Sequence, residues 1–257
     1  MITFCISNIK GGVAKTTTAA NLAAGLHKRG FKVLMIDSDP QINLTMSFIP
    51  EPEDNFPSLY HVYSKGSLID DIKVEVKSGL DLVVGDLELC SADLEFQKRI
   101  GWLKILSKAI KEIKTDYDFV VIDTPPNLGC LTLNAFIACD YIITPMQAES
   151  FSLKAVRLLK KTLDEIAEEK NDKTNVAGVL LTRYTDRLVI AKALESNVIS
   201  SAELLNTTVF NNKIRPTKTV PESQLLKQSL FDYAPKAAVT KDYDGFITEL
   251  LSRTGVK

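Results

Sequence analysis

The 257-residue sequence lacks any long hydrophobic run, because no stretch approaches the roughly 18 consecutive apolar residues of a membrane-spanning helix. It also lacks the basic lead of a signal peptide, since the first five residues already read as a strand. We therefore expect a soluble, cytoplasmic protein with no stable membrane anchor. An excess of charge of one sign is missing as well: 31 Lys and Arg oppose 32 Asp and Glu. Any binding to nucleic acid must then come from a local patch.

Cysteine is scarce, and no two cysteines have the CxxC spacing of a metal or redox motif. The thiols lie far apart or in apolar runs, at Cys5, Cys90, Cys130 and Cys139. We expect them to be reduced and mostly buried. Linkers, low-complexity tracts and internal repeats are also absent, and the Pro- and acid-rich stretch 49–54 is typical of a surface loop. The sequence therefore predicts a single domain over residues 1–257.

Short apolar runs rich in Val and Ile alternate with longer segments of helical periodicity. The runs are apolar on both faces, as strands buried between two helix layers should be. The predicted strands are Ile2–Asn8, Lys32–Ile36, Leu80–Val84, Phe119–Ile122, Tyr141–Thr144 and Val176–Leu181. The predicted helices are Lys15–Arg29, Ser91–Ile113, Leu131–Ala138, Ser152–Glu169, Leu188–Ser200 and Val239–Ser252. This alternation predicts an α/β fold with a doubly wound, mostly parallel sheet and helices on both faces.

The segment after the first predicted strand has the composition of a phosphate-binding loop. Gly11 and Gly12 allow successive backbone N–H groups to turn toward an anion, and the following helix adds its positive N-terminus. Lys15 is placed to reach the β- and γ-phosphates of a nucleotide, and the Thr16 hydroxyl to bind Mg²⁺. The general pattern GxxxxGK[ST] fails, however, because Ile9 and Ala14 stand where its glycines belong. An ordinary glycine turn between strand and helix is the alternative.

Two later strands end in carboxylates. Asp37 and Asp39 follow one apolar run, and Asp123 ends another. In an open parallel sheet, ligands bind just beyond the carboxyl ends of the strands, so these groups can face a metal ion at the loop. A single Asp at such a turn is common for structural reasons. Together with the Gly-Gly-Lys-Thr loop, the three favour nucleotide binding.

These segments resemble the boxes of the ParA/MinD family of deviant Walker A ATPases. Residues 10–17 are similar to the deviant Walker A box with its early lysine, 37–41 to the second box, and 122–126 to Walker B. Residues 214–216 and 234–243 resemble the ParA C-terminal pattern, so the likeness runs nearly end to end. The departure is Ala14, where glycine is usual. A methyl group tolerates a helical or bridge backbone but not a strongly positive φ, so we expect a slightly altered approach to phosphate.

The resemblance implies a role for each residue of these boxes. Lys15 and the loop amides hold the phosphates, Thr16 and Asp123 organise Mg²⁺, and Asp37 supports the metal shell. The ATP-binding set from the loop is Lys10, Gly11, Gly12, Val13, Ala14, Lys15, Thr16 and Thr17.

Two residues carry the catalytic expectations that the resemblance implies. Asp39 orients or deprotonates the attacking water. Lys10 reaches the phosphates of the partner subunit in an ATP-dependent homodimer. Without the family match, an exposed lysine before a turn is an ordinary solvated side chain.

The adenine is expected over the carboxyl ends of later strands, near Arg183, Arg215 and Pro216. An arginine plane can stack on a purine, and loop backbone groups can read its edge. Arg and Pro after a strand are also ordinary loop residues.

The function implied first is that of a plasmid or chromosome partition ATPase. Such a protein dimerises with ATP, binds DNA nonspecifically, and is released by hydrolysis that a ParB-like centromere-binding partner stimulates. It would be cytoplasmic and associated with DNA. From Thr207 to Lys241, six positive side chains face two negative ones, which favours binding to phosphates. A solvated surface explains the same count nearly as well.

Three other functions remain open. A MinD-like membrane-cycling ATPase needs a basic amphipathic C-terminal helix, and residues 242–257 are too acidic for one. An iron protein of the same superfamily needs paired cysteines, whereas Cys130 and Cys139 lie in apolar contexts typical of packing. A nucleotide-binding module without hydrolysis is the third.

Overall fold

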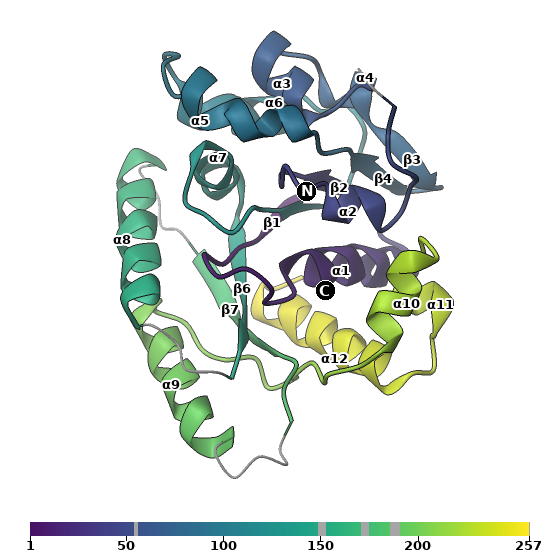
Figure 1. Ribbon diagram of the computed structural model, residues 1–257, viewed down its shortest axis with the longest axis vertical. Coiled ribbons are helices and arrows are strands. Elements are labelled where there is room, and N and C mark those ends of the chain that lie inside the picture. Colours follow the sequence, from purple (N-terminus) through teal and green to yellow (C-terminus); the bar gives the residue numbers. More distant parts are fainter. Residues whose placement is uncertain (54–55, 149–152, 171–174, 186–190, 257) are drawn as a thin grey trace.

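One seven-stranded sheet forms the centre of the computed structural model, with the order β3-β4-β2-β5-β1-β6-β7 (Figure 1). The structure describes residues 1–53, 56–148, 153–170, 175–185 and 191–256. The strands are β1 (Ile2–Ile6), β2 (Val33–Asp37), β3 (Val74–Lys77), β4 (Leu80–Val83), β5 (Phe119–Asp123), β6 (Tyr141–Gln147) and β7 (Asn175–Thr182). All neighbours pair in parallel except β3, which is antiparallel to β4 at the edge. The predicted fold class is confirmed.

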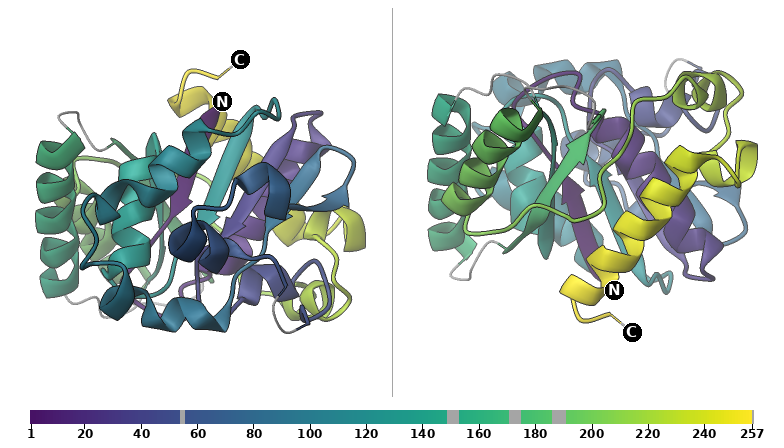
Figure 2. Two further views of the ribbon diagram at one scale, coloured as in Figure 1. Left: turned by 90° about the horizontal axis from the view of Figure 1, so that it is seen from above. Right: turned by 90° about the horizontal axis from the view of Figure 1, so that it is seen from below.

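Helices cover both faces of the sheet, so the buried strands are apolar on both sides (Figure 2). One face carries α3 (Leu59–Lys65), α4 (Ile69–Ile72), the 3-10 helix η1 (Leu87–Ser91), α5 (Ala92–Glu95), the 3-10 helix η2 (Trp102–Lys104), α6 (Ile105–Lys111), α7 (Cys130–Ala138), α8 (Leu153–Lys170) and α9 (Ala191–Leu204). The other carries α1 (Lys15–Lys28), α2 (Asn43–Met46), α10 (Thr219–Leu225), α11 (Leu230–Tyr233) and α12 (Ala238–Arg253).

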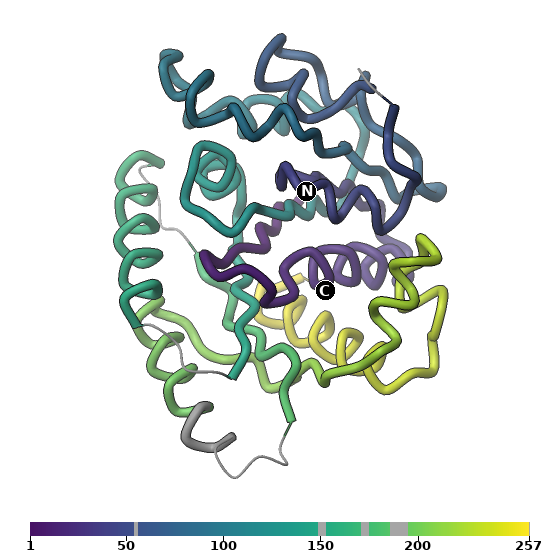
Figure 3. The backbone as a smooth tube through the Cα atoms, in the orientation of Figure 1, coloured from purple at the N-terminus to yellow at the C-terminus, as the bar shows by residue number. Residues whose placement is uncertain are grey.

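The C-terminal helix α12 is a core element that packs on α1. Its apolar side chains Tyr243, Phe246, Ile247 and Leu250 are all fully buried. Gly25 in α1 permits this approach, because a Cβ there would lie 2.3 Å from Ile247 Cδ1. The backbone tube shows the chain running from α9 through α10 and α11 to the side of α1 (Figure 3). This path brings C-terminal residues beside the helix that begins at the glycine loop.

Several predicted elements differ from the structure. The helix predicted over 91–113 is wrong, since this segment forms α5, η2 and α6, and Gly101 with φ 74° interrupts it. Strand β6 continues past its predicted end and contains Pro145, which has no backbone N–H to donate. Pro145 lies beyond the residues of β6 that pair with β1, so the pairing of these two strands loses no hydrogen bond. Edge strand β3 was not predicted. Residue 152 and residues 188–190 of two predicted helices lie outside the described residues.

Among the described residues, none of the helices combines the length and hydropathy that crossing a bilayer requires.

Candidate nucleotide-binding site

The loop between β1 and α1 is held in shape by polar side chains from strand ends. Gln147 Nε2 donates to the Gly12 carbonyl over 2.7 Å, and Thr182 Oγ1 donates to the Val13 carbonyl over 3.1 Å. Asn8 Nδ2 donates to the Pro145 carbonyl over 2.7 Å. Residues 8, 147 and 182 were not predicted as site residues. The only sequence signal is that each polar residue lies at or just beyond the carboxyl end of an apolar strand. They fix the backbone so that its N–H groups can converge on an anion.

Ala14 occupies the left-handed region, with φ 66° and ψ 34°, as does Gly12 with φ 76°. The expectation that a methyl group would keep this position out of strongly positive φ is therefore wrong. An L-residue other than glycine costs roughly 1–2 kcal/mol in this conformation. The neighbouring contacts hold the strained backbone, and the helix begins immediately after it at Lys15. Strain of this kind concentrates at ligand-binding loops.

The Lys15 side chain folds back over the loop. Its ammonium donates to the Lys10 carbonyl over 3.4 Å, and the residue is only 7% exposed. Burial lowers the pKa of Lys15, and the nearby carboxylates of Asp123 and Asp39 oppose this effect. An anion bound in the loop would favour the charged ammonium further. Lys10 itself is exposed beside the loop.

Asp37 and Asp123 face each other across neighbouring strands, in register at the ends of β2 and β5. Both are completely buried. Asp37 is well bonded: its Oδ2 accepts from Thr45 N and from Thr45 Oγ1, each over 2.7 Å, and its Oδ1 accepts from Asp39 N over 3.3 Å. Burial nevertheless raises the pKa of Asp37 to about 6.

Asp123 lacks the hydrogen bonds that Asp37 has, because neither of its carboxylate oxygens has a well-formed hydrogen bond among the described residues. Burial and the charge of Asp37 raise the pKa of Asp123 well above its ordinary value. The Thr16 hydroxyl lies beside the carboxyl group and lowers this pKa without forming a well-aligned hydrogen bond. A buried, unsatisfied carboxylate is costly unless a cation or a bound water satisfies it. The pair Thr16 and Asp123 therefore fits a hydrated divalent cation.

A cavity of about 530 Å³ opens over the loop. It brings together many residues predicted for the site: Gly11, Gly12, Ala14, Lys15, Thr16, Thr17, Asp39 and Arg183. It also contains residues that were not predicted: Gln41, Asn43, Met46, Ser47, Pro126, Gln224 and Lys227. Asp39 is nearly buried in its wall, and its Oδ1 accepts from Gln41 N over 2.9 Å. The C-terminal pair Gln224 and Lys227 carries no motif, so the sequence offers no signal for it.

Arg215 and Pro216 do not line this cavity and are exposed. The Arg215 guanidinium binds Asp242 of α12 at both ends, with Nε to Oδ2 at 2.6 Å and Nη2 to Oδ1 at 2.8 Å. Lys213 likewise pairs with Glu195 over 2.5 Å. Two of the six positive charges in the segment 207–241 are thus paired with carboxylates from outside it. The net positive charge at this surface is therefore smaller than the count along segment 207–241 indicates.

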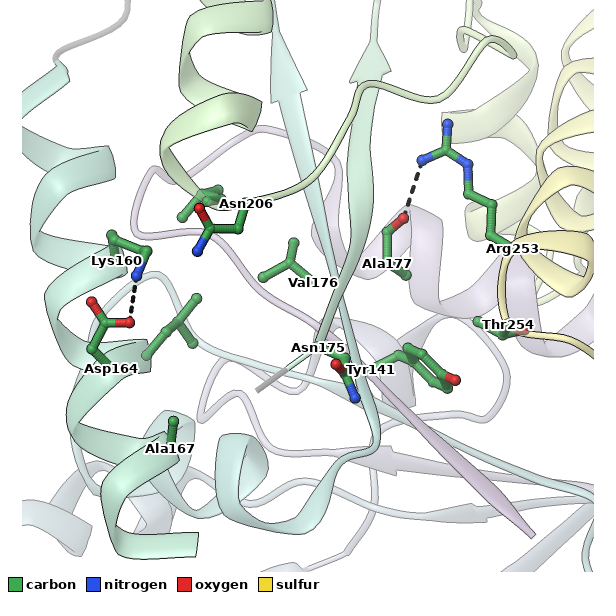
Figure 4. A pocket seen from close by; sticks show the side chains of 12 residues that line it. Tyr141, Lys160, Asp164, Ala167, Asn175, Val176, Ala177, Asn206, Arg253 and Thr254 are labelled. Atoms are coloured by element: carbon green, nitrogen blue, oxygen red, sulfur yellow. Dashed lines mark hydrogen bonds and ion pairs between the residues drawn. The ribbon is translucent and has the colours of Figure 1, made fainter. Parts of the chain in front are cut away.

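A second cavity, of about 550 Å³, lies at the amino ends of β6 and β7, away from the loop (Figure 4). Its polar groups bind one another: Lys160 pairs with Asp164, and Arg253 donates to the Ala177 carbonyl over 3.1 Å. Ligands of open α/β sheets bind at the carboxyl ends of the strands, which places the functional site at the loop and not here.

The cysteines are not grouped into a metal site within the described part of this chain. All four thiols are free; Cys90 is exposed, while Cys5, Cys130 and Cys139 are buried. Within the described ranges, no three His, Cys, Asp or Glu side chains lie close enough to hold a metal ion by themselves. A cation at Thr16 and Asp123 would therefore need further ligands from water or a bound phosphate, which is how Mg²⁺ is usually held.

A glycine loop that opens a helix, a buried lysine and carboxylates at the ends of adjacent parallel strands define a P-loop nucleotide-binding protein. The AAA domain family matches residues 1–176. The chain is 30% identical over 251 residues to the chromosome partitioning protein ParA of Caulobacter vibrioides, covering 96% of this chain and 93% of that one. It is 36% identical over 183 residues to the sporulation initiation inhibitor protein Soj of Bacillus subtilis, covering 71% and 72%. The chain belongs to the ParA/MinD family of deviant Walker A ATPases and is similar to its ParA and Soj members.

Solved structures agree on the fold. Cobyrinic acid a,c-diamide synthase from Mycobacterium smegmatis, with an ATP analogue and magnesium bound, superposes with a TM-score of 0.86. The two chains are 29% identical, and the match covers 99% of this chain and 95% of that one. Its name and those of ParA and Soj describe different activities, so the likeness in structure does not by itself choose among them.

Proposed function

We propose that the chain is an ATPase of DNA partition, with residues 1–257 forming one ATPase domain that binds ATP with Mg²⁺. The observation that carries the nucleotide chemistry is the buried Asp123 carboxylate, which lies beside the Thr16 hydroxyl and lacks a well-formed hydrogen bond in the part of the chain that the structure describes. The kinship with ParA and Soj supports partition as the purpose of that chemistry.

Each residue of the site has a physical task in this proposal. The amides of the loop and the Lys15 ammonium bind the phosphates, because the loop lines the cavity and Lys15 brings a buried cation to it. Thr16 and Asp123 hold Mg²⁺, and Asp37 keeps Asp39 and Thr45 in place through its hydrogen bonds. When bound, Mg²⁺ neutralises charge on the transferred phosphoryl group.

Asp39 orients or deprotonates the attacking water. It lies in the cavity wall, and its hydrogen bond from Gln41 N uses only one carboxylate oxygen among the bonds described. The other oxygen is therefore available to a water molecule, as the reaction requires.

The ATP-dependent homodimer rests on Lys10. Its backbone is fixed from both sides, because its N–H donates to Asn8 Oδ1 over 3.0 Å and its carbonyl accepts from Lys15. The side chain itself is exposed. A cation presented from a fixed backbone can reach the nucleotide of a second subunit, so that ATP stabilises the dimer through its differential affinity for the two states. DNA would then bind nonspecifically through phosphate contacts, and a ParB-like partner would stimulate release.

Membrane cycling of the MinD type has less support. It requires a C-terminal amphipathic helix whose apolar face is free to bind the bilayer. Among the described residues, α12 instead places Tyr243, Phe246, Ile247 and Leu250 against the core.

Three substitutions test the proposal. Lys15→Ala should abolish ATP binding in calorimetry, while Lys28→Ala, at the exposed end of the same helix, should leave it unchanged. Asp39→Asn keeps an oxygen to accept from Gln41 N but cannot take a proton, so it should bind ATP and hydrolyse it about 10²–10⁴ times more slowly. In that background, ATP should give dimers by light scattering, and Lys10→Ala should return monomers that still bind ATP. Unchanged ATP affinity in Lys15→Ala would refute the P-loop assignment, and dimers without Lys10 would refute its role.

A further inference from the structure

Lys227 is a cation in the wall of the nucleotide cavity that comes from the C-terminal part of the chain. It follows α10 and lies in the same cavity as Lys15, Thr16 and Thr17. Its ammonium donates to the carbonyl of Met46, the last residue of α2. Lys227 therefore connects the segment after α10 with the helix that follows Asp39.

The backbone at Lys227 has a conformation that lysine adopts with difficulty. Its φ is 56°, and it directly follows Leu226, the C-cap residue of α10. Lys227 N donates to the Gln224 carbonyl over 3.0 Å, and Gln228 N donates to the Ser223 carbonyl over 2.9 Å. This is the Schellman ending of a helix, in which glycine is strongly preferred at the left-handed position. Lysine is unfavourable for the backbone at this position, so the conformation of the helix end gives no reason for a lysine side chain there.

Left-handed residues other than glycine gather at this cavity. Five occur among the described residues, and three of them line it: Ala14, Arg183 and Lys227. Two of these three are cations, carried by the segments after β7 and α10. Strained backbone at a ligand site holds side chains in positions that an unstrained chain would not present.

We propose that Lys227 is a nucleotide-binding residue that recognises the phosphate charge from the C-terminal part of the cavity lining. The inference rests on the function proposed above and adds a residue to its binding site. By binding both Met46 and the nucleotide anion, Lys227 would link phosphate binding to the position of α10 and α11. Lysine suits this task because its ammonium has three donors and can serve two acceptors at once.

The test uses Lys227→Asn and Lys227→Gly in the full chain. Both residues tolerate the left-handed backbone, so the melting temperature without nucleotide should be unchanged or higher. Calorimetry with Mg²⁺ should show Kd for ATP and ADP raised about 5- to 20-fold, as expected for a lost charge-assisted hydrogen bond. Adenosine, measured by displacement of a fluorescent ADP, should bind as it does to the unchanged protein. Lys227→Arg should retain most of the affinity.

Lys236→Asn is the matched control, because Lys236 is exposed on the same C-terminal segment and does not line the cavity. Its affinities should equal those of the unchanged protein. If ATP and ADP bind equally well to Lys227→Asn, Lys227 only caps α2 and the inference is wrong. An equal loss for adenosine would place Lys227 on the nucleoside and refute phosphate recognition. If the unchanged protein bound neither ATP nor ADP, the proposed function itself would fail, which distinguishes the two failures.

Discussion

Replacing Asp123 by Asn should stabilise the protein in the absence of Mg²⁺ and nucleotide, although it removes a residue of the site. The carboxylate is completely buried, has no well-formed hydrogen bond within the described ranges and lies in register with Asp37. Each unit by which folding raises the pKa of a carboxyl group costs about 1.4 kcal/mol of stability at a pH above both values. The pKa of Asp37 is raised to about 6 despite three hydrogen bonds, which corresponds to a cost of about 3 kcal/mol in folding free energy. This value gives the scale for a buried carboxylate at this edge of the sheet. We expect Asn at position 123 to recover stability on that order, because it removes a buried charge that has no hydrogen bond among the described residues.

For a chain of this length, 1 kcal/mol corresponds to about 2–4 °C in melting temperature, so at a scale of about 3 kcal/mol Asp123→Asn should melt about 6–12 °C higher at pH 7.5. The way in which the stability difference between the two proteins changes with pH follows from the raised pKa of Asp123. The folded protein binds the proton more tightly than the unfolded chain, so the carboxylate destabilises increasingly as pH rises from about 4 toward the folded pKa. The advantage of the Asn variant should therefore be small near pH 4 and grow toward neutral pH.

The matched control is Asp37→Asn, one strand away in the same register. Asn has one acceptor oxygen and would turn N–H groups toward the donors of Thr45, so this variant should melt lower than the unchanged protein. With Mg²⁺ and ATP, the unchanged protein should gain stability from binding and Asp123→Asn should gain little. A lower melting temperature for Asp123→Asn, or a difference that does not vary between pH 5 and 8, would refute the reasoning.

Three further outcomes follow from the same contacts. Ala14→Gly relieves a left-handed alanine and should raise the melting temperature by about 1–3 °C in a thermal scan, and no rise would show that the site is unstrained. Thr45→Val removes the hydroxyl that donates to Asp37 and accepts from Gly85 N. The free energy of unfolding measured in urea should fall by about 2–3 kcal/mol, and a fall below about 1 kcal/mol would contradict the role given to these two hydrogen bonds. Arg215→Ala breaks an exposed ion pair, so the melting temperature should change little and the ATP affinity in calorimetry should be unchanged. Weaker ATP binding would show that Arg215 belongs to the site.

The centre of the site could be predicted because its residues lie at strand ends. The glycine pair, Lys15 and the carboxylates at 37, 39 and 123 each follow an apolar run, and the run identifies the strand end from nearby residues alone. The side chains that shape the loop, Gln147 and Thr182, escaped prediction because they contact it across 135 and 169 residues of sequence. Their composition is ordinary, and only the sheet brings them to the loop.

The sequence alone determined six of the seven described strands, the P-loop and the family, since periodicity, helix-start chemistry and motif spacing act over a few neighbouring residues. The tertiary structure decided which strands are neighbours, because pairing is fixed by burial and backbone hydrogen bonds between distant segments. It thereby set Asp37 beside Asp123, paired Arg215 with Asp242 away from the cavity, and brought Lys227 into it. It also forced Ala14 into a left-handed conformation against its own preference, since the loop contacts outweigh a local strain of roughly 1–2 kcal/mol.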